Sequence, residues 1–385
     1  MTATPVVLES RPERVPEGTA AAVVAATDIR RLRSIVDQAA AADVDRALGR
    51  GRRTLEDFAV LLSPAAAARL EDLAGVARDI SRARFGATVR LFAPLYVSNE
   101  CVSTCTYCGF SAGNDIARRT LSVPEVKAEA GELNRRGFRH LLLVSGEHAR
   151  IVSKEYLEAC VRAVADSFAQ VSVEVQVWDT DTYRRLAAAG CDGVVVYQES
   201  YDTGTYGAVH LKGKKRNYAW RLAAPDRAAE AGMRRLGIGT LLGLHPDWRS
   251  EALALACHAQ ALIKKWWRCE VQVALPRLRP AAGGYEPQDP VSDQALTQLL
   301  CALRIFLPDV GVSLSTREPA WLRDGLVPLG VTLMSAGSHT EPGGYAEVSA
   351  AEPQFSVSDT RSPAEVAAAL RAAGYDPVWK DWQRA

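Results

Sequence analysis

The sequence predicts an α/β fold in which eight parallel strands close into a (βα)8 barrel, with an N-terminal helical extension and a short C-terminal extension. From about residue 87 onward, short apolar runs rich in β-branched residues alternate with longer amphipathic segments. The short runs are apolar almost throughout, which is typical of parallel strands covered on both faces. A chain of 385 residues suits one such barrel with extensions. A doubly wound open sheet is the alternative, because the pattern alone does not prove closure.

This pattern divides the chain into a helical extension (1–86), the barrel (87–340) and a C-terminal extension (341–385). In the first part, helical periodicity covers 27–41 and 54–62. Ser63-Pro64 then places a cap residue and a first-turn proline before a helix that runs to residue 84. The expected strands are 88–97, 140–145, 171–177, 193–198, 236–242, 271–275, 310–315 and 331–335. The expected helices are 123–136, 154–168, 181–189, 219–231, 250–266, 293–303 and 319–326, followed by 362–373 in the C-terminal extension.

The composition argues against several classes of partner. There are 46 Lys and Arg residues against 45 Asp and Glu residues, a formal net charge of +1. No overall basic bias therefore favours nucleic acid or an anionic membrane. No run is long and apolar enough to span a bilayer, and residues 1–18 lack the basic-then-apolar order of a signal peptide. We expect a cytoplasmic protein with no nucleic-acid partner and no membrane partner.

Three cysteines, Cys101, Cys105 and Cys108, form a C-x3-C-x2-C motif. A structural zinc site and an ordinary electron-transfer iron–sulfur cube both take four protein ligands. Three thiolates on one loop would hold a [4Fe-4S] cube by three irons and leave the fourth iron open to a small molecule. The alternative is a zinc or iron–sulfur scaffold completed by a distant ligand. The other five cysteines are isolated and are expected to be small buried hydrophobes: Cys160, Cys191, Cys257, Cys269 and Cys301.

Polar residues follow the expected strands where each strand ends. In a parallel barrel these ends meet on one face, where active sites are built. Some of these residues could instead cap the following helices. In chain order they are the three cysteines after the first strand, Gly146-Glu147, Glu174 and Gln176, Gln198-Glu199, Arg277 and Arg279, Arg317, and Ser335.

The cysteine spacing, with Tyr107 directly before Cys108, resembles the signature of the radical S-adenosylmethionine (SAM) superfamily. A more extended similarity, from about residue 90 to the C-terminus, is to the tyrosine lyases of thiamine biosynthesis. The stretches that carry it are Leu95-Tyr96-Val97-Ser98-Asn99, Cys105-Thr106-Tyr107-Cys108-Gly109-Phe110-Ser111, Leu141-Leu142-Leu143-Val144-Ser145-Gly146-Glu147-His148, Val196-Tyr197-Gln198-Glu199-Ser200-Tyr201, His210-Leu211-Lys212-Gly213-Lys214-Lys215, Pro276-Arg277-Leu278-Arg279-Pro280, Ser315-Thr316-Arg317-Glu318, Pro342-Gly343-Gly344-Tyr345-Ala346 and Pro377-Val378-Trp379-Lys380-Asp381-Trp382.

The resemblance implies a TIM-type radical SAM barrel, a [4Fe-4S] cluster and SAM as cofactors, and L-tyrosine as substrate. It also implies the reaction: a 5'-deoxyadenosyl radical takes a hydrogen from the tyrosine amino group, and the Cα–Cβ bond breaks to give 2-iminoacetate and p-cresol. The 2-iminoacetate then passes to thiazole synthase. A reductant such as flavodoxin or ferredoxin is a further implied partner.

Three residues are expected on the substrate side of the site. Arg317 is suited to bidentate capture of the substrate carboxylate, with an ion pair to a neighbouring Glu as the alternative. Ser335 resembles a polar residue near the substrate backbone in related lyases, and its alternative is a loop cap. Tyr96 could line the substrate pocket or serve as ordinary barrel packing.

The cofactor side is expected to include Glu147, which resembles the glutamate beside the SAM ammonium. A carboxylate suits that position because it accepts charge-assisted hydrogen bonds. Tyr107 could pack against adenine or belong to the core. Arg277 and Arg279 could steady a carboxylate, but alternate residues of a strand point to opposite faces, so only one of them should face the site. Further candidates for ribose hydroxyls and ligand amides are Glu174, Gln176 and Gln198.

Two alternatives concern the substrate and the pathway. The tyrosine lyase of hydrogenase maturation carries a cysteine-bearing C-terminal extension, and the present C-terminal region lacks such cysteines. Tryptophan lyases share several motifs, and Trp178 and Ala112-Gly113 depart from the pattern expected for the thiamine family.

The segment 212–215 is expected to be a solvated loop, with partner or electron-donor binding as its alternative. Trp379 and Trp382 could dock thiazole synthase or seal the bottom of the barrel.

Overall fold

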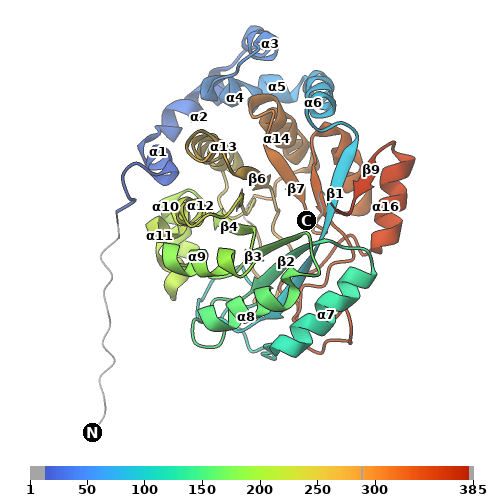
Figure 1. Cartoon of the computed structure of the whole chain (residues 1–385). Helices are drawn as coiled ribbons and strands as arrows, with labels where there is room; N and C mark the ends of the chain where they lie inside the picture. Colours follow the sequence, from blue (N-terminus) through green and yellow to red (C-terminus); the bar gives the residue numbers. More distant parts are fainter. Residues whose placement is uncertain (1–13, 288, 381–385) are drawn as a thin grey trace.

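Eight parallel strands close into a barrel in the computed structural model, which describes residues 14–287 and 289–380 (Figure 1). The strands follow one another around the barrel in chain order, and β1 closes it by pairing with both β8 and β2. The predicted barrel is therefore confirmed, and the alternative of an open sheet is wrong. The strands are β1 Thr88–Ser98, β2 His140–Ser145, β3 Gln170–Glu174, β4 Gly193–Glu199, β5 Arg235–Thr240, β6 Glu270–Ala274, β7 Gly311–Leu314 and β8 Leu333–Ser335.

The eight predicted strands are all present, with differences of up to three residues at their ends. β3 ends at Glu174, so Gln176 lies in the following loop rather than on a strand. β6 ends at Ala274, which leaves Arg277 and Arg279 in a loop as well. The predicted strand 331–335 begins only at Leu333. An additional short strand, β9 (Asp376–Val378), pairs in parallel with the start of β1 and was not predicted.

The helices cover the outside of the barrel (Figure 1). The predicted helix 219–231 is two helices, because Pro225 begins a new first turn after a break at Ala223. A seven-residue helix after β4 was also missed. These helices are α7 Val123–Arg135, α8 Lys154–Ala165, α9 Thr180–Ala188, α10 Thr203–Val209, α11 Tyr218–Leu222, α12 Ala224–Glu230, α13 Trp248–Lys265, α14 Asp293–Phe306 and α15 Ala320–Leu326.

The N-terminal extension packs against α13 and α14. Gln298 of α14 donates its amide to the carbonyls of Leu61 and Ser63, and Asp226 accepts from the Ala20 amide. The predicted helix 27–41 is shorter at both ends, because Asp28 caps its start and the helix ends at Gln38; the predicted helix from Pro64 to residue 84 is interrupted at residues 68–69. The helices are α1 Ala20–Ala26, α2 Ile29–Gln38, α3 Ala41–Gly49, α4 Leu55–Leu61, α5 Pro64–Ala67 and α6 Leu70–Phe85.

The C-terminal extension crosses the carboxyl ends of the strands and then returns along the outside to their amino ends. Ser356 donates to the Pro280 carbonyl and Ser358 to the Thr316 carbonyl, both beyond strand carboxyl ends. Helix α16 (Pro363–Ala372) then leads to β9. Trp379 packs on Phe138, at the amino end of β2, with ring centroids 5.3 Å apart. This supports the sealing role for Trp379, whereas Trp382 lies outside the described residues.

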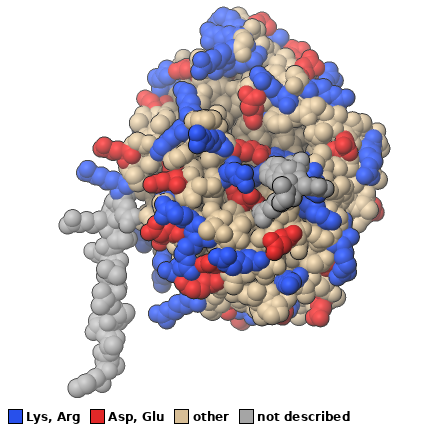
Figure 2. Space-filling view, in the orientation of Figure 1, with Lys and Arg blue, Asp and Glu red and all other residues tan. Residues whose placement is uncertain are grey.

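Charged side chains of both signs are interspersed over the face shown in Figure 2. This distribution agrees with the formal net charge of +1. Among the described residues, the helices are all too short or too polar to cross a bilayer.

A fully buried ion pair fixes the extension to the barrel, and it gives a stability prediction. Arg323 of α15 pairs with Asp359, and neither side chain is exposed. Replacing Asp359 by Ala leaves a buried guanidinium without its carboxylate, so we expect a loss of about 3–5 kcal/mol in the free energy of unfolding. Urea unfolding of the metal-free protein measures it. The exposed pair of Arg84 and Asp309, 3.4 Å apart, supplies the control. Asp309→Ala should change stability by no more than about 0.5 kcal/mol, and equal losses in the two variants would contradict the prediction.

Candidate active site

The three cysteines lie on a loop that follows β1, which we call the cluster loop (residues 99–111). Neighbouring segments hold this loop through its backbone. Val102 donates to the Glu147 carbonyl at 2.9 Å, beyond β2, and Thr106 donates to the Val209 carbonyl at 3.0 Å, beyond β4. Gly213, with a φ of +93°, lies so close to Ser103 that an added Cβ would stand 2.6 Å from the Ser103 Cα. The cluster loop is therefore held by the segments that follow two other barrel strands, β2 and β4.

The three thiols are free; Cys105 is buried and Cys101 and Cys108 are half-buried. Burial raises the pKa of each of them, and the Lys215 ammonium acts in the opposite direction on the pKa of Cys105 and Cys108. Iron binds the thiolate, so a nearby cation favours the form that ligates. Within residues 14–287 and 289–380, no three His, Cys, Asp or Glu side chains converge as a single metal ion requires. Three thiolates that each bind a different iron of a cube need no such convergence, and this donor set fits a [4Fe-4S] cluster.

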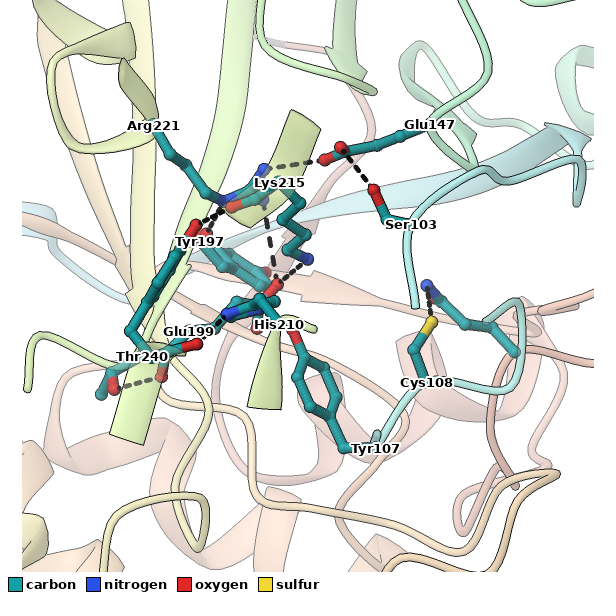
Figure 3. A network of polar contacts seen from close by, with 12 residues as sticks. Ser103, Tyr107, Cys108, Glu147, Tyr197, Glu199, His210, Lys215, Arg221 and Thr240 are labelled. Carbon is teal, nitrogen blue, oxygen red and sulfur yellow. Dashed lines mark hydrogen bonds and ion pairs between the residues drawn. The ribbon is translucent and has the colours of Figure 1, made fainter. Parts of the chain in front are cut away.

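Next to the cluster loop lies a buried network of two carboxylates and two cations (Figure 3). Arg221 of α11 donates to Glu147 at 2.9 Å, and Lys215 donates to Glu199 at 2.7 Å. Ser103, on the cluster loop, donates to the other oxygen of Glu147 at 3.4 Å. Burial alone would raise the pKa of Glu199, but Lys215 and then Arg221 outweigh it, so the pKa lies below its ordinary value. The network is thus balanced in charge and joined to the loop that carries the cysteines.

Lys215 and Glu199 are site residues that the sequence analysis assigned to neither the substrate side nor the cofactor side. The expectation of a solvated loop fails at Lys215, whose side chain is only 12% exposed. It fails because the partner carboxylate comes from another segment of the chain, at the end of β4. Glu199 is also the one described non-glycine residue with a positive φ, +69°, at an irregularity in the β4–β5 register. Strain of this kind concentrates at functional sites. In the sequence, the one indication of a functional role was that Glu199 lies at the end of an expected strand.

The glutamine and tyrosine candidates of the cofactor side have different environments. Gln198 is 2% exposed, and neither its amide nitrogen nor its carbonyl oxygen has a partner among the described residues, so both can serve a ligand. Gln176 instead donates to the Val152 carbonyl at 3.0 Å, which holds the loop after β2. Tyr107 is buried, and its hydroxyl lies 2.9 Å from the Nε2 of His210. Burial lowers the pKa of His210 to about 3, so the ring is neutral.

A second group of residues lies inside the barrel mouth. Tyr96 and Glu174 stand at the same level, because Val144 of β2 is in register with both. Phe110 packs edge-on against Tyr96, with centroids 5.9 Å apart. Burial first, and the charge of Glu199 second, raise the pKa of Glu174 to about 7, whereas Arg317 lowers it. No hydrogen bond or ion pair of the described residues involves the Glu174 carboxyl.

Arg317 is half-buried and makes no ion pair with a described carboxylate. The Glu that follows it, Glu318, pairs with Arg277 and Arg279 instead, the latter at 3.1 Å. Both arginines lie in a loop, so strand alternation does not decide which of them faces the site. The same pairing excludes Glu318 as the partner of Arg317. Ser335 is buried, and its hydroxyl accepts from the Thr316 amide at 3.2 Å, which positions the loop carrying Arg317.

Comparisons with known proteins identify the family of this chain. The Radical SAM superfamily model matches residues 95–256, and the Biotin and Thiamin Synthesis associated domain matches residues 274–376. A 2-iminoacetate synthase of Escherichia coli (strain K12) is 45% identical over 342 residues, which cover 89% of this chain and 91% of that protein.

The chain belongs to the 2-iminoacetate synthase family. As a radical SAM family, it uses a [4Fe-4S] cluster and SAM. Among solved structures, HydG, a maturase of the [FeFe]-hydrogenase, has a TM-score of 0.87 at 33% identity, covering 93% of this chain and 80% of HydG. Methylornithine synthase (PylB) has a TM-score of 0.72 at 20% identity and covers 87% of this chain and 97% of PylB, a similarity of fold alone.

The unpaired carboxyl of Glu174 gives a prediction about pH. Its pKa of about 7 in the folded protein lies above the ordinary 4.5, so the native state holds this proton more tightly than the unfolded chain. Ionisation therefore costs stability progressively as the pH rises from 4.5 to 7. We expect Glu174→Gln to raise the free energy of unfolding by up to roughly 3 kcal/mol at pH 8 and to give no such gain at pH 4.

Urea unfolding of the metal-free protein at the two pH values measures this difference, with Glu286→Gln at an exposed position as the control. A gain of equal size at pH 4 and pH 8 would show that packing, not ionisation, is responsible.

Proposed function

We propose how this chain's residues carry out the family reaction. The protein is a radical SAM lyase that cleaves the Cα–Cβ bond of L-tyrosine to 2-iminoacetate and p-cresol, for thiazole formation in thiamine biosynthesis. The observation that carries the residue assignments is that three cysteines lie at the same barrel mouth as Arg317, which has no carboxylate partner within residues 14–287 and 289–380. When bound, the cluster and SAM supply a 5'-deoxyadenosyl radical that removes a hydrogen from the substrate amino group.

Arg317 binds the substrate carboxylate. Its guanidinium is half-buried, pairs with none of the described carboxylates and matches a carboxylate in bidentate geometry. Ser335 helps to position Arg317, because its hydroxyl accepts a hydrogen bond from the amide of the preceding residue, Thr316. Glu174 lies close enough to Arg317 for its pKa to be lowered by that charge, and it accepts a hydrogen bond from the substrate amino group. Tyr96 and Phe110 form the aromatic wall against which the substrate ring packs.

Glu147 and Gln198 act on the cofactor side. Glu147 lies beside the cluster loop, where its carboxylate accepts from the SAM ammonium while Arg221 donates to one of its oxygens and holds it in place. Gln198 has a buried amide without a described partner and offers a donor and an acceptor to the ribose hydroxyls. Tyr107 shapes the wall next to the adenine, with its hydroxyl held by His210. Gln176 and Arg279 position neighbouring segments of the site: Gln176 donates to the Val152 carbonyl, and Arg279 pairs with Glu318.

The partners follow from the chemistry. The 2-iminoacetate passes to thiazole synthase, and a flavodoxin or ferredoxin supplies the electron. We place the protein in the cytoplasm, because all eight cysteines are free thiols, as a reducing compartment requires.

The electron donor docks on the surface that covers the cluster loop. Thr104 of that loop exchanges backbone hydrogen bonds of 3.2 Å with Leu211 and Lys212. Val102 is 45% exposed and Leu211 is 49% exposed, and the Lys212 and Lys214 side chains beside them are exposed as well. An apolar centre with basic neighbours is complementary to an acidic electron-transfer protein.

Reversing the charges at Lys212 and Lys214 tests this docking surface. With both changed to Glu, we expect reduction of the cluster by a reduced flavodoxin to slow about tenfold or more at low ionic strength, because steering is lost. Stopped-flow absorbance measures the rate. Reduction by dithionite, which needs no docking, should keep its rate. The paired control changes the exposed Lys127 and Lys264 to Glu. Equal slowing in this control would show that the change in net charge, and not the loss of a docking surface, slows the reduction.

Tyrosine cleavage tests the assignment of Arg317. In anaerobic assays with SAM and dithionite, we expect p-cresol from tyrosine and no cleavage of tryptophan. Arg317→Ala should lower kcat/KM for tyrosine by about 100-fold or more, since a charged bidentate contact is lost, while 5'-deoxyadenosine still forms without cleavage.

Arg234→Ala, at an exposed side chain, is the matched control and should behave as the wild type. Loss of cluster iron in Arg317→Ala would assign this arginine to the metal site instead. Products of tryptophan cleavage would support the alternative substrate.

A further inference from the structure

One segment of the C-terminal extension, which we call the strap (residues 353–359), crosses the barrel mouth from the cluster loop to the loop after β7. At one end, Gly109 donates to the Gln354 carbonyl at 3.2 Å. An added Cβ on Gly109 would stand 2.4 Å from that carbonyl oxygen, so this close approach requires glycine. At the other end, Ser358 and Asp359 donate to the Thr316 carbonyl at 2.9 and 3.1 Å. The buried pair of Asp359 and Arg323 anchors this end.

The side chain of Gln354 points from the strap into the site. Its Nε2 donates to the Sγ of Cys108 at 3.7 Å, and its Oε1 accepts from the Tyr96 hydroxyl at 2.9 Å. Both atoms of one amide are thus used, and each partner belongs to the site described above. The direction of the amide is fixed by these partners, because a phenol that donates needs the carbonyl and a sulfur acceptor needs the NH2.

The next residue along the strap contacts the substrate side. The Arg317 guanidinium carbon lies 3.4 Å from the centroid of the Phe355 ring, a stacked cation–π arrangement. Thr340 supports this position by donating to the Phe355 carbonyl at 2.9 Å and by accepting from the Gln354 amide at 2.9 Å. Two consecutive strap residues therefore contact a cluster ligand and the arginine assigned to the substrate.

We propose that Gln354 is a positioning residue that sets the reduction potential of the cluster by donating to the Cys108 sulfur, and that it holds the strap closed over the site. This proposal rests on the proposed function, because it takes Cys108 as a cluster ligand. A hydrogen bond to a ligating sulfur withdraws negative charge from it and stabilises the reduced cluster, so hydrogen bonds to the sulfurs are among the factors that set cluster potentials. The bond from Tyr96 fixes the amide so that its NH2 faces the sulfur.

Two substitutions separate the contacts of Gln354. Gln354→Met keeps the size of the side chain and removes both donor and acceptor. Gln354→Glu keeps an acceptor for Tyr96 and brings a carboxylate toward the sulfur in place of the donor. Gln294→Met, at an exposed position of α14, is the matched control. The reduction potential of the reconstituted holoprotein, followed by electron paramagnetic resonance, is the readout.

We expect both Gln354 variants to be harder to reduce than the wild type, with about a tenfold fall in the reduction equilibrium constant, which corresponds to about 59 mV for one electron. Gln354→Glu should show the larger fall because of its charge. Potentials equal to those of Gln294→Met, in protein with full iron content, would overturn the proposal. Should the wild type itself assemble no cluster, it is the proposed function that fails.

A second readout needs no cluster. In the metal-free protein, Gln354→Met should speed cleavage of the Phe355–Ser356 bond by chymotrypsin several-fold, because the strap has lost its side-chain anchor. The Gln294→Met control should be cut at the wild-type rate. Unchanged cleavage in Gln354→Met would show that Gln354 does not hold the strap, and this result decides the matter even if the variants bind too little iron for a potential.

Discussion

Three sulfur atoms on one short, irregular loop must be held together at the mouth of the barrel, and the site depends on this constraint. The cluster loop is held by backbone hydrogen bonds to segments that follow other strands. Its partners are the Glu147 carbonyl beyond β2 and residues 209–212 beyond β4. Because the barrel fixes where those strands end, it also fixes where the cysteines lie. Closure of the barrel by β1 and β2 is therefore a condition for ligating the cluster as well as for folding.

Charge is arranged around this loop so that buried ions balance one another. Glu147 and Glu199 face Arg221 and Lys215, with side chains between 7% and 12% exposed. Removing such groups from water is expensive, and each is tolerated only because its partner is present. The arrangement places a fixed ammonium near two thiols that must lose their protons to bind iron. On the opposite side of the mouth, Arg317 has no carboxylate partner among the residues that the structure describes, which leaves a positive charge for an acidic ligand group.

The barrel could be predicted because both faces of each strand are buried, which makes the strands continuous apolar runs in the sequence. The cluster loop could be predicted because its three ligands are local. The ion pair of Lys215 and Glu199 could not be predicted, because nothing in the sequence indicates that these two residues contact each other. Gln354 lies 258 residues from Tyr96, in a segment without regular structure, so no periodicity indicates it. Local patterns predict what one segment does alone, whereas contacts between segments require the fold.

The central claim is that three cysteines leave one iron of the cluster open to SAM. Mössbauer spectroscopy of protein reconstituted with the Mössbauer-active iron isotope tests it most directly, with and without SAM. The account predicts one distinct iron among the four, whose isomer shift rises when SAM is added while the other three irons are unaffected. Four irons with the same parameters, unchanged by SAM, would contradict it.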